Sequence, residues 1–333
     1  MLIGDYSSFK KISGVLLLLI LFATAAGAAN APAQIYPNRP VRVILPQLPG
    51  SSVDTITRIV ATKMSDTMGQ QFIVDNRGGA GGLIGAQIGA RATPDGYTLI
   101  SGAASSLIIT SFTYKKLGFD PFKDFEPISL IVAAEAVLAV GNNVPARSVK
   151  ELIALAKASP GQLRMASSGL GSSSHLAGVL FTSLTGIDTL HVPYKGGMSA
   201  TSVISGETQW CILPAAALAG HIKAGRVRAL GISSQQRSPL MPDLPTIAEA
   251  GVPGYEYTSW NGFFAPRGVP RPIITKVHST LQKVLAQPDL KQYYANQGLV
   301  PMGSASPEEF GKFFRADFER IGKVVKLAGI KPE

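Results

Sequence analysis

Residues 41–54 read Val-Arg-Val-Ile-Leu-Pro-Gln-Leu-Pro-Gly-Ser-Ser-Val-Asp, and this stretch decides the fold. Its first five residues are mostly apolar and lie between Pro40 and Pro46, which predicts a short buried strand. From residue 53 to 68 apolar residues recur at helical spacing, with Ser51 or Ser52 to cap the helix and Gly69 to end it. A strand, a Gly/Ser loop and a helix in direct succession are typical of a parallel α/β sheet.

The same succession continues along the chain. Two capping boxes, Ser148 with Glu151 and Ser306 with Glu309, predict the starts of helix 149–158 and of the last helix. The apolar stretch 127–140 is too long for one ordinary strand, so we expect it to lead the chain from one lobe to another, with 258–265 as the return. Further strands are predicted at 71–74, 97–101, 164–166, 190–192, 210–212 and 228–232, with helices between them.

The length of the chain predicts two lobes, because 333 residues exceed one typical core. We expect an α/β protein with mostly parallel central sheets and two crossovers between the lobes. Lobe 1 is predicted to comprise residues 34–133 and 260–333, and lobe 2 residues 134–259.

The N-terminus has the three parts of a secretory signal peptide. Lys10 and Lys11 precede an apolar run over 15–22, and small residues follow over 23–33. Cleavage is predicted after Ala28 or Ala33. The alternative is a membrane anchor, but the apolar run is short for a hydrocarbon layer of about 30 Å.

Composition narrows the function. Cys211 is the one cysteine, so no intramolecular disulfide can form. The net charge of +10 is compatible with nucleic-acid binding, but export argues against such a partner. A basic surface, or the steering of anionic ligands, accounts for the charge instead.

Three Gly/Ser loops, over 49–54, 76–82 and 166–175, each follow a predicted strand and precede a helix. In a parallel sheet such loops gather at the carboxyl ends of the strands, where ligands bind. Their backbone N–H groups and hydroxyls suit an anion, helped by the helix dipoles. Any one of them is equally an ordinary tight turn, but three in this layout favour a binding site.

The motifs of common enzymes are missing from the sequence. It contains no G-x-S-x-G elbow, no G-x-G-x-x-G and no P-loop. The four histidines have no metal-ligand spacing, and no pair of carboxylates suits acid–base work. We therefore predict no catalytic residues, no metal and no cofactor. A hydrolase on the same scaffold is the alternative from another class, and it lacks a nucleophile–base pair.

At the loops the sequence resembles the Bug family, the periplasmic binding proteins of tripartite tricarboxylate transporters. The resemblance begins with Tyr36-Pro37-x-Arg39-Pro40, the Pro-Gly loop that ends in Asp54, and Asn76-Arg77-x-Gly79-Ala80-Gly81-Gly82. It continues in order over essentially the whole mature chain, through 94–99, 171–175, 191–196, 221–225, 245–251 and 259–260.

This resemblance implies a type II, venus-flytrap binding protein in the periplasm, without catalysis. It implies a small carboxylate ligand and, as partners, the membrane subunits of a tripartite tricarboxylate transporter. We expect a monomer that does not bind nucleic acid. A sensing protein that docks on a membrane receptor is an alternative that the sequence does not separate from a transport protein.

Carried over position by position, the resemblance implies ligand-binding residues on both lobes. Three of these residues have a structural alternative. Asp54 in the first turn of a helix and His175 at a helix start each suit a structural role. Lys195 is equally a solvated turn residue. On lobe 1 the implied residues are Gly50, Ser51, Ser52 and Asp54, joined by Ser101, Ser105 and Ser106. On lobe 2 they are Ser167, Gly171, Ser172, Ser173, His175, Tyr194, Lys195 and Gly196, together with Leu213.

The sequence departs from the family pattern at two places. Many relatives have an Asp about where Leu213 stands, and there it can meet an ammonium group of the ligand. Because an unpaired ammonium is costly to bury, we expect free amino acids to be poor ligands and an apolar or aromatic far end of the ligand to be favoured. Gln47 and Leu48 stand where relatives often have an aromatic residue and a Pro, which changes the shape of the pocket.

Overall fold

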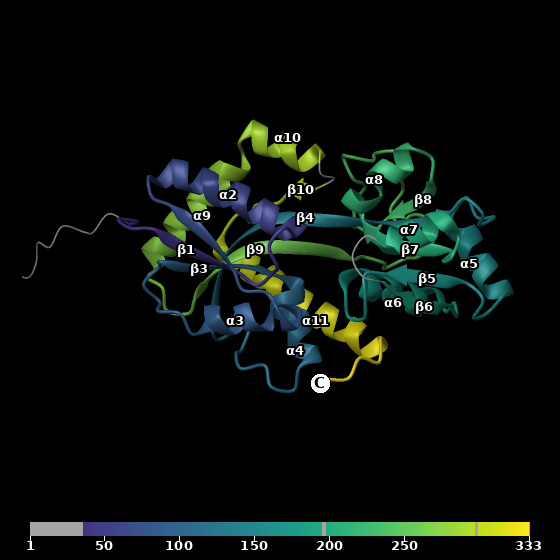
Figure 1. The fold of residues 1–333 in the computed structure, drawn as a ribbon, viewed down its shortest axis with the longest axis horizontal. Coiled ribbons are helices and arrows are strands. Elements are labelled where there is room, and N and C mark those ends of the chain that lie inside the picture. The colour runs from purple at the N-terminus through teal and green to yellow at the C-terminus, as the bar shows by residue number, and fades with distance from the viewer. Residues whose placement is uncertain (1–35, 195–197, 297–298, 333) are drawn as a thin grey trace, which may run out of the picture. The chain divides into compact units, whose positions relative to one another are not determined.

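The strands of the computed structural model pair in the order β2-β1-β3-β9-β4-β7-β5-β6, and β10 and β8 also pair with β4 (Figure 1). The structure describes residues 36–194, 198–296 and 299–332. The fold below is that of residues 39–333, which make one compact unit. The predicted signal peptide, 1–33, lies outside the described residues.

The first sheet contains the predicted strand–loop–helix unit. Strands β1 (Val41–Leu45), β2 (Phe72–Asn76) and β3 (Thr98–Ala103) are parallel, with β1 in the middle. Helices on one face are α2 (Ser52–Met68), α9 (Arg271–Leu285) and α10 (Pro288–Asn296). On the other face are α3 (Leu83–Ala90), α4 (Thr110–Thr113) and α11 (Pro307–Leu327) (Figure 1). We call these elements lobe 1.

The second sheet, with its helices, forms lobe 2. Its strands are β5 (Arg164–Ser167), β6 (Leu190–Pro193), β7 (Trp210–Pro214) and β8 (Val227–Ile232). Helices α7 (Met198–Ser205) and α8 (Ala215–Lys223) pack on one face against Val137 and Ala139. Helices α5 (Val149–Ala158) and α6 (Ser173–Thr185) contribute to the core on the other face.

Two long strands join the lobes, as predicted. β4 (Phe125–Gly141) pairs with β9 and with β10 (Val300–Pro301) in the first sheet and then with β7 and β8 in the second. β9 (Thr258–Pro266) leads the chain back. The change of sheet falls at Glu135 and Ala136, which pair with Thr258 and Pro214 respectively.

The prediction of mostly parallel sheets holds only for strands that are linked by helices. The described parallel pairs are β1–β2, β1–β3, β5–β6 and β5–β7. The described antiparallel pairs all involve β4 or β9, because an outgoing and a returning strand run in opposite directions. The rule for strand–helix–strand units does not apply to such crossovers.

The segment after β3 is helical, which the sequence analysis did not predict. A π-helical turn, η3 (Ser105–Ile109), leads directly into α4. The hydroxyl of Ser106 bonds to both the N–H and the C=O of Ala103, at 3.2 Å each, and so ties the helix start to the strand end. No helix among the described residues has the length and apolar content needed to cross a membrane.

Candidate functional site

The first Gly/Ser loop is a β-turn that leads into α2. The N–H of Ser51 donates to the carbonyl of Leu48 at 3.4 Å. Gly50 has a φ of 79°, which the third residue of a type II turn requires. Ser51 then caps α2, because its hydroxyl accepts the N–H of Asp54 at 3.1 Å.

Asp54 fixes this loop from the first turn of α2. Its carboxylate accepts the N–H of Gly50 at 2.9 Å and the side-chain amide of Asn76 at 2.9 Å. It also pairs with Arg58 at 2.9 Å and is only 5% exposed. Burial alone would raise the pKa of Asp54, but the hydrogen bonds from Gly50, Asn76 and Arg58 lower it overall. Both carboxylate oxygens are therefore occupied by protein groups.

The third Gly/Ser loop repeats this construction in lobe 2. The N–H of Ser172 donates to the carbonyl of Gly169 at 3.2 Å, and Gly171 has a φ of 70°. The hydroxyl of Ser172 accepts the N–H of His175 at 3.2 Å and so caps α6. Nδ1 of His175 in turn accepts the N–H of Gly171 at 3.1 Å. An accepting Nδ1 means that the ring is neutral; burial, with a smaller effect of His191, lowers its pKa to about 4.

Both helix starts leave donors open. A helix has unpaired N–H groups in its first turn, and in each loop the serine and the turn satisfy two of them. The first two residues of α2 and of α6 precede the N–H group that the serine cap satisfies, so their N–H groups have no acceptor within the helix. Together with the positive ends of two helix dipoles, these groups suit an anion.

The second Gly-rich loop packs between the first loop and η3. Gly82 has a φ of 100°, and a Cβ added to it would stand 2.6 Å from the Cβ of Ser106 and 2.8 Å from the carbonyl oxygen of Pro46. Glycine is therefore required for the three segments to approach one another. This close packing holds the first and second loops together at the carboxyl ends of β1 and β2.

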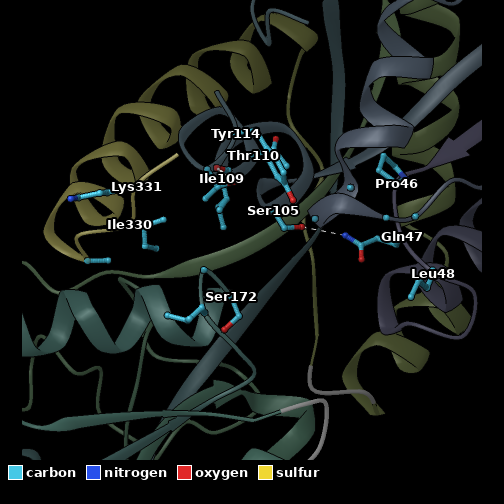
Figure 2. A pocket seen from close by; sticks show the side chains of 18 of the residues that line it. Pro46, Gln47, Leu48, Ser105, Ile109, Thr110, Tyr114, Ser172, Ile330 and Lys331 are labelled. Atoms are coloured by element: carbon cyan, nitrogen blue, oxygen red, sulfur yellow. Dashed lines mark hydrogen bonds between the residues drawn. The ribbon is translucent and has the colours of Figure 1, made fainter. Parts of the chain in front are cut away.

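A cavity of about 760 Å³ lies between the lobes at these loops (Figure 2). On the lobe 1 side, the side-chain amide of Gln47 donates to the hydroxyl of Ser105 at 3.3 Å. On the lobe 2 side, Ser172 lines the cavity (Figure 2). Lys331 is the one ionised residue of the described lining, which contains no carboxylate. The lining also includes Pro46, Leu48, Gly78, Gly79, Gly81, Gly82, Ile109, Thr110, Thr113, Tyr114, Leu170, Gly171, Ala328, Gly329 and Ile330.

Three of the predicted site residues, Ser105, Gly171 and Ser172, line this cavity. Gly50, Ser51 and Asp54 belong to the loop that continues from its lining residue Leu48. Ser52 begins α2, and its side chain is not among those described. Lys195 and Gly196 lie outside the described residues.

Four predicted site residues lie in the protein interior. The hydroxyl of Ser101 bonds to Thr57 at 2.8 Å and to Asn261 at 3.0 Å. Ser106 ties η3 to β3, as described above. Leu213 is 1% exposed and packs in the core of lobe 2, because the inward face of β7 is apolar. Ser167 is fully buried and bonds to His191 at 2.6 Å.

The remaining three predicted residues have other neighbours. His175 is 5% exposed and accepts the N–H of Gly171, as described above. Ser173 lies close to the buried Tyr257, which precedes β9. Tyr194 lies beside Ser202 and Glu207 in a separate hollow at α7. Burial, with a smaller effect of the nearby Glu207 carboxylate, raises the pKa of Tyr194.

Other lining residues were not singled out from the sequence as ligand-binding. Leu170 belongs to the third Gly/Ser loop, but an apolar side chain does not indicate an anion site. The C-terminal residues 328–331 follow α11 and had no motif at all. Ile109, Thr110 and Tyr114 were missed because the helical turn after β3 has no clear apolar period.

The chemistry of the site is that of binding. The described residues contain no group of three acidic, His or Cys side chains placed to hold a metal ion. Ser167 and His191 are a hydroxyl and an imidazole at hydrogen-bond distance, but the hydroxyl is fully buried and no substrate reaches it in this conformation. Backbone donors, hydroxyls and Lys331 remain in the described lining, and such groups suit an anion.

Two α/β sheets joined by two long crossover strands, with a loop-lined cavity between them, define the class of two-lobed solute-binding proteins. A family model identifies the family within this class. Residues 56–330 match the tripartite tricarboxylate transporter family receptor, and the chain belongs to this family. As predicted, Bug proteins are among its relatives. Protein BugT of Bordetella pertussis is 34% identical over 94% of this chain and 96% of its own.

Solved structures agree with this assignment. The structure of R. palustris Rpa4515 with adipate is 35% identical, covers 90% of this chain and 100% of its own, and superposes with a TM-score of 0.77. MatC (Rpa3494) from Rhodopseudomonas palustris with bound malate is 29% identical, covers 87% of this chain and 100% of its own, and has a TM-score of 0.72. The predicted binding-protein fold is thereby confirmed.

Proposed function

We propose that this protein is an extracytoplasmic receptor that captures a small organic carboxylate between its lobes and presents it to a tripartite tricarboxylate transporter. Two relatives of the same fold are described with a dicarboxylate, adipate in one and malate in the other. The N-terminal signal pattern supports export to the periplasm, where such a receptor would meet its ligand.

One observation supports carboxylate binding above the others. The cavity between the lobes has backbone donors, hydroxyls and one lysine in its described lining, and no carboxylate. A carboxylate ligand needs hydrogen-bond donors and no negative neighbours, and charge-assisted bonds to such donors are the strong ones. A cationic ligand would find no partner of opposite charge in this lining.

Capture requires the lobes to close on the ligand. We propose that the lobes meet near residues 133/134 and 259/260, close to the point where β4 passes from one sheet to the other. A ligand that contacts both lobes binds the closed form more tightly and so shifts the population toward it. An affinity in the micromolar range corresponds to about −8 kcal/mol, which still permits release to a transporter.

A thermal-shift screen tests this function. The mature chain is heated with mono-, di-, tri- and aromatic carboxylates and with free amino acids, and binding raises the melting temperature by mass action. We expect at least one carboxylate to raise it and the amino acids to have little effect. A screen in which only amino acids or uncharged solutes raise the melting temperature would contradict the proposal.

A charge variant then places the ligand in the cavity. Gln47→Glu keeps the shape of a lining residue and adds a negative charge, so we expect the affinity for the carboxylate to fall by about tenfold. Gln71→Glu makes the same charge change at an exposed position outside the described lining and is expected to leave the affinity unchanged. Equal affinities for both variants would place the ligand elsewhere.

A further inference from the structure

Two large apolar side chains lie exposed at the cavity, one from each lobe. Leu48 of the first loop is 67% exposed and Leu170 of the third loop is 76% exposed. Both belong to the lining of the same cavity. Exposure of a leucine side chain to water is energetically unfavourable. Apolar surface gathered at a cavity therefore indicates a place where a ligand is bound.

Hydrogen-bonded turns hold both leucines in place. Leu48 is the first residue of the turn that Ser51 closes, and its Cδ2 would be 2.8 Å from a Cβ added to Gly78. Leu48 therefore lies against the backbone of the second loop at Gly78. Leu170 is the second residue of the turn that Ser172 closes through its N–H and its hydroxyl, at 3.2 and 2.7 Å from the carbonyl of Gly169. The turns fix the backbone from which each leucine side chain projects, so little backbone freedom is lost when a ligand arrives.

The rest of the lining contains both polar and apolar groups. Gln47, Ser105 and Ser172 supply polar atoms near the loops, whereas Ile109 and Ile330 add apolar surface. The leucines come from opposite lobes, so closure would bring them together around the body of a ligand whose carboxylate is held by the polar groups. A polar or strongly branched ligand body would leave this apolar surface in contact with water.

We propose that Leu48 and Leu170 determine specificity and that they select an organic carboxylate with an unbranched methylene chain. This inference rests on the proposed function, because it takes the cavity to be the carboxylate site. It assigns the two leucines to the uncharged part of the ligand, and the loop donors to the carboxylate.

Chain-length dependence of the affinity tests this inference. Unbranched ligands of four, six and eight carbons are compared by calorimetry, using monocarboxylates or α,ω-dicarboxylates according to which class gives the larger thermal shift in the screen. For the natural chain we expect a gain of about two- to fourfold in affinity per added methylene. For Leu48→Ser/Leu170→Ser we expect this gain to fall to near one, with the four-carbon ligand bound almost as tightly as before.

A matched double variant provides the control. Ile73→Ser/Leu184→Ser also removes one exposed apolar side chain from each lobe, at positions that are 53% and 45% exposed and outside the described lining. It is expected to keep the chain-length gain. The inference is overturned if the leucine variant keeps the gain, or if it loses affinity equally for all three lengths. Absence of carboxylate binding in the natural chain would instead overturn the proposed function, so the two failures are distinct.

Discussion

Asp54 and His175 hold equivalent positions in the two lobes. Each is the third residue of its helix, and each accepts the backbone N–H of the glycine four residues earlier, Asp54 from Gly50 at 2.9 Å and His175 from Gly171 at 3.1 Å. In each lobe the serine between them caps the helix. The two loops beside the cavity are therefore held by the same device, built with a charged acceptor in lobe 1 and a neutral one in lobe 2.

The neutral acceptor makes lobe 2 sensitive to acid. Burial lowers the pKa of His175 to about 4, with a further contribution from His191, whose ring stacks on it at 4.0 Å. Its pKa in the unfolded chain is about 6.5, so only the unfolded state takes up the proton between these values. We expect each pH unit lost in that window to remove up to about 1.4 kcal/mol of stability. Urea unfolding at pH 7.5, 6, 5 and 4.5 measures this loss.

The variant His175→Asn isolates the contribution of this ring. An asparagine oxygen can accept the N–H of Gly171 and does not titrate. We expect the difference in unfolding free energy between the natural chain and the variant to change steadily from pH 6.5 toward 4, since carboxylates contribute equally to both. A difference that does not vary with pH would show that folding does not lower the pKa of His175.

Asp54 is expected to support both stability and ligand affinity. Asp54→Ala leaves the N–H of Gly50, the amide of Asn76 and the guanidinium of Arg58 without this acceptor, so we expect a loss of about 2–4 kcal/mol. The first loop should loosen as well, which lowers the affinity for the ligand. Because the pKa of Asp54 is lowered in the folded state, its stabilisation is present above about pH 4 and is lost as the pH falls through that lowered value.

Glu151→Ala is the matched control for this experiment. Glu151 also accepts a backbone N–H four residues earlier, that of Arg147 at 2.7 Å, in the capping box of α5. It is exposed and outside the described lining of the cavity. We expect a smaller loss of stability than for Asp54→Ala, and unchanged affinity. If Asp54→Ala also left the affinity unchanged, the first loop would have no part in binding.

Local patterns predicted much of this fold. The caps at Ser51, Ser148 and Ser306 are found where they were expected, because a cap depends on residues within one turn of the helix. The long strand β4 was visible as an apolar run, since a strand buried in both sheets needs apolar residues throughout. The pairing of β9 with β3 as well as with β4 was not, because strand partners are set by tertiary packing.

The candidate site was harder to predict residue by residue. The Gly/Ser composition identifies the loops, but it does not show which hydroxyls face outward. Ser101 and Ser172 are both serines near strand ends, yet Ser101 bonds inside the core and Ser172 faces the cavity. Residues such as Tyr114 and Ile330 reach the cavity only through tertiary packing. The residues next to them in the sequence form no motif that predicts a binding site.

Leu213 illustrates the same difficulty and leads to a prediction. Its side chain is buried in the lobe 2 core, whereas the next residue, Pro214, is exposed at the start of α8. We expect Leu213→Asp to lose several kcal/mol of stability, because a carboxylate would enter an apolar core. Pro214→Asp should be tolerated, since an aspartate suits a helix N-cap. Melting temperatures of the two variants make the comparison, and a stable Leu213→Asp protein would show that this position can face solvent or ligand.

The last prediction concerns Glu135, where β4 passes from one sheet to the other. Glu135 is 8% exposed, and its Oε2 has no hydrogen-bond partner among the described residues. Water solvates this carboxylate in the unfolded chain, so burial without a partner is expected to cost about 1–3 kcal/mol. Glu135 lies two residues before Val137 and so on the same strand face, which continues into the apolar core of lobe 2.

We therefore expect Glu135→Leu to raise the urea midpoint of unfolding. Glu126→Leu is the control on the same strand, because Glu126 is paired with Arg267 at 2.7 Å and its removal should leave the midpoint unchanged or slightly lower. A lower midpoint for Glu135→Leu would mean that the carboxylate has a stabilising partner in solution. Since this residue marks the junction of the lobes, a raised midpoint together with weaker ligand binding would show that the buried charge is retained for movement between the lobes at the expense of stability.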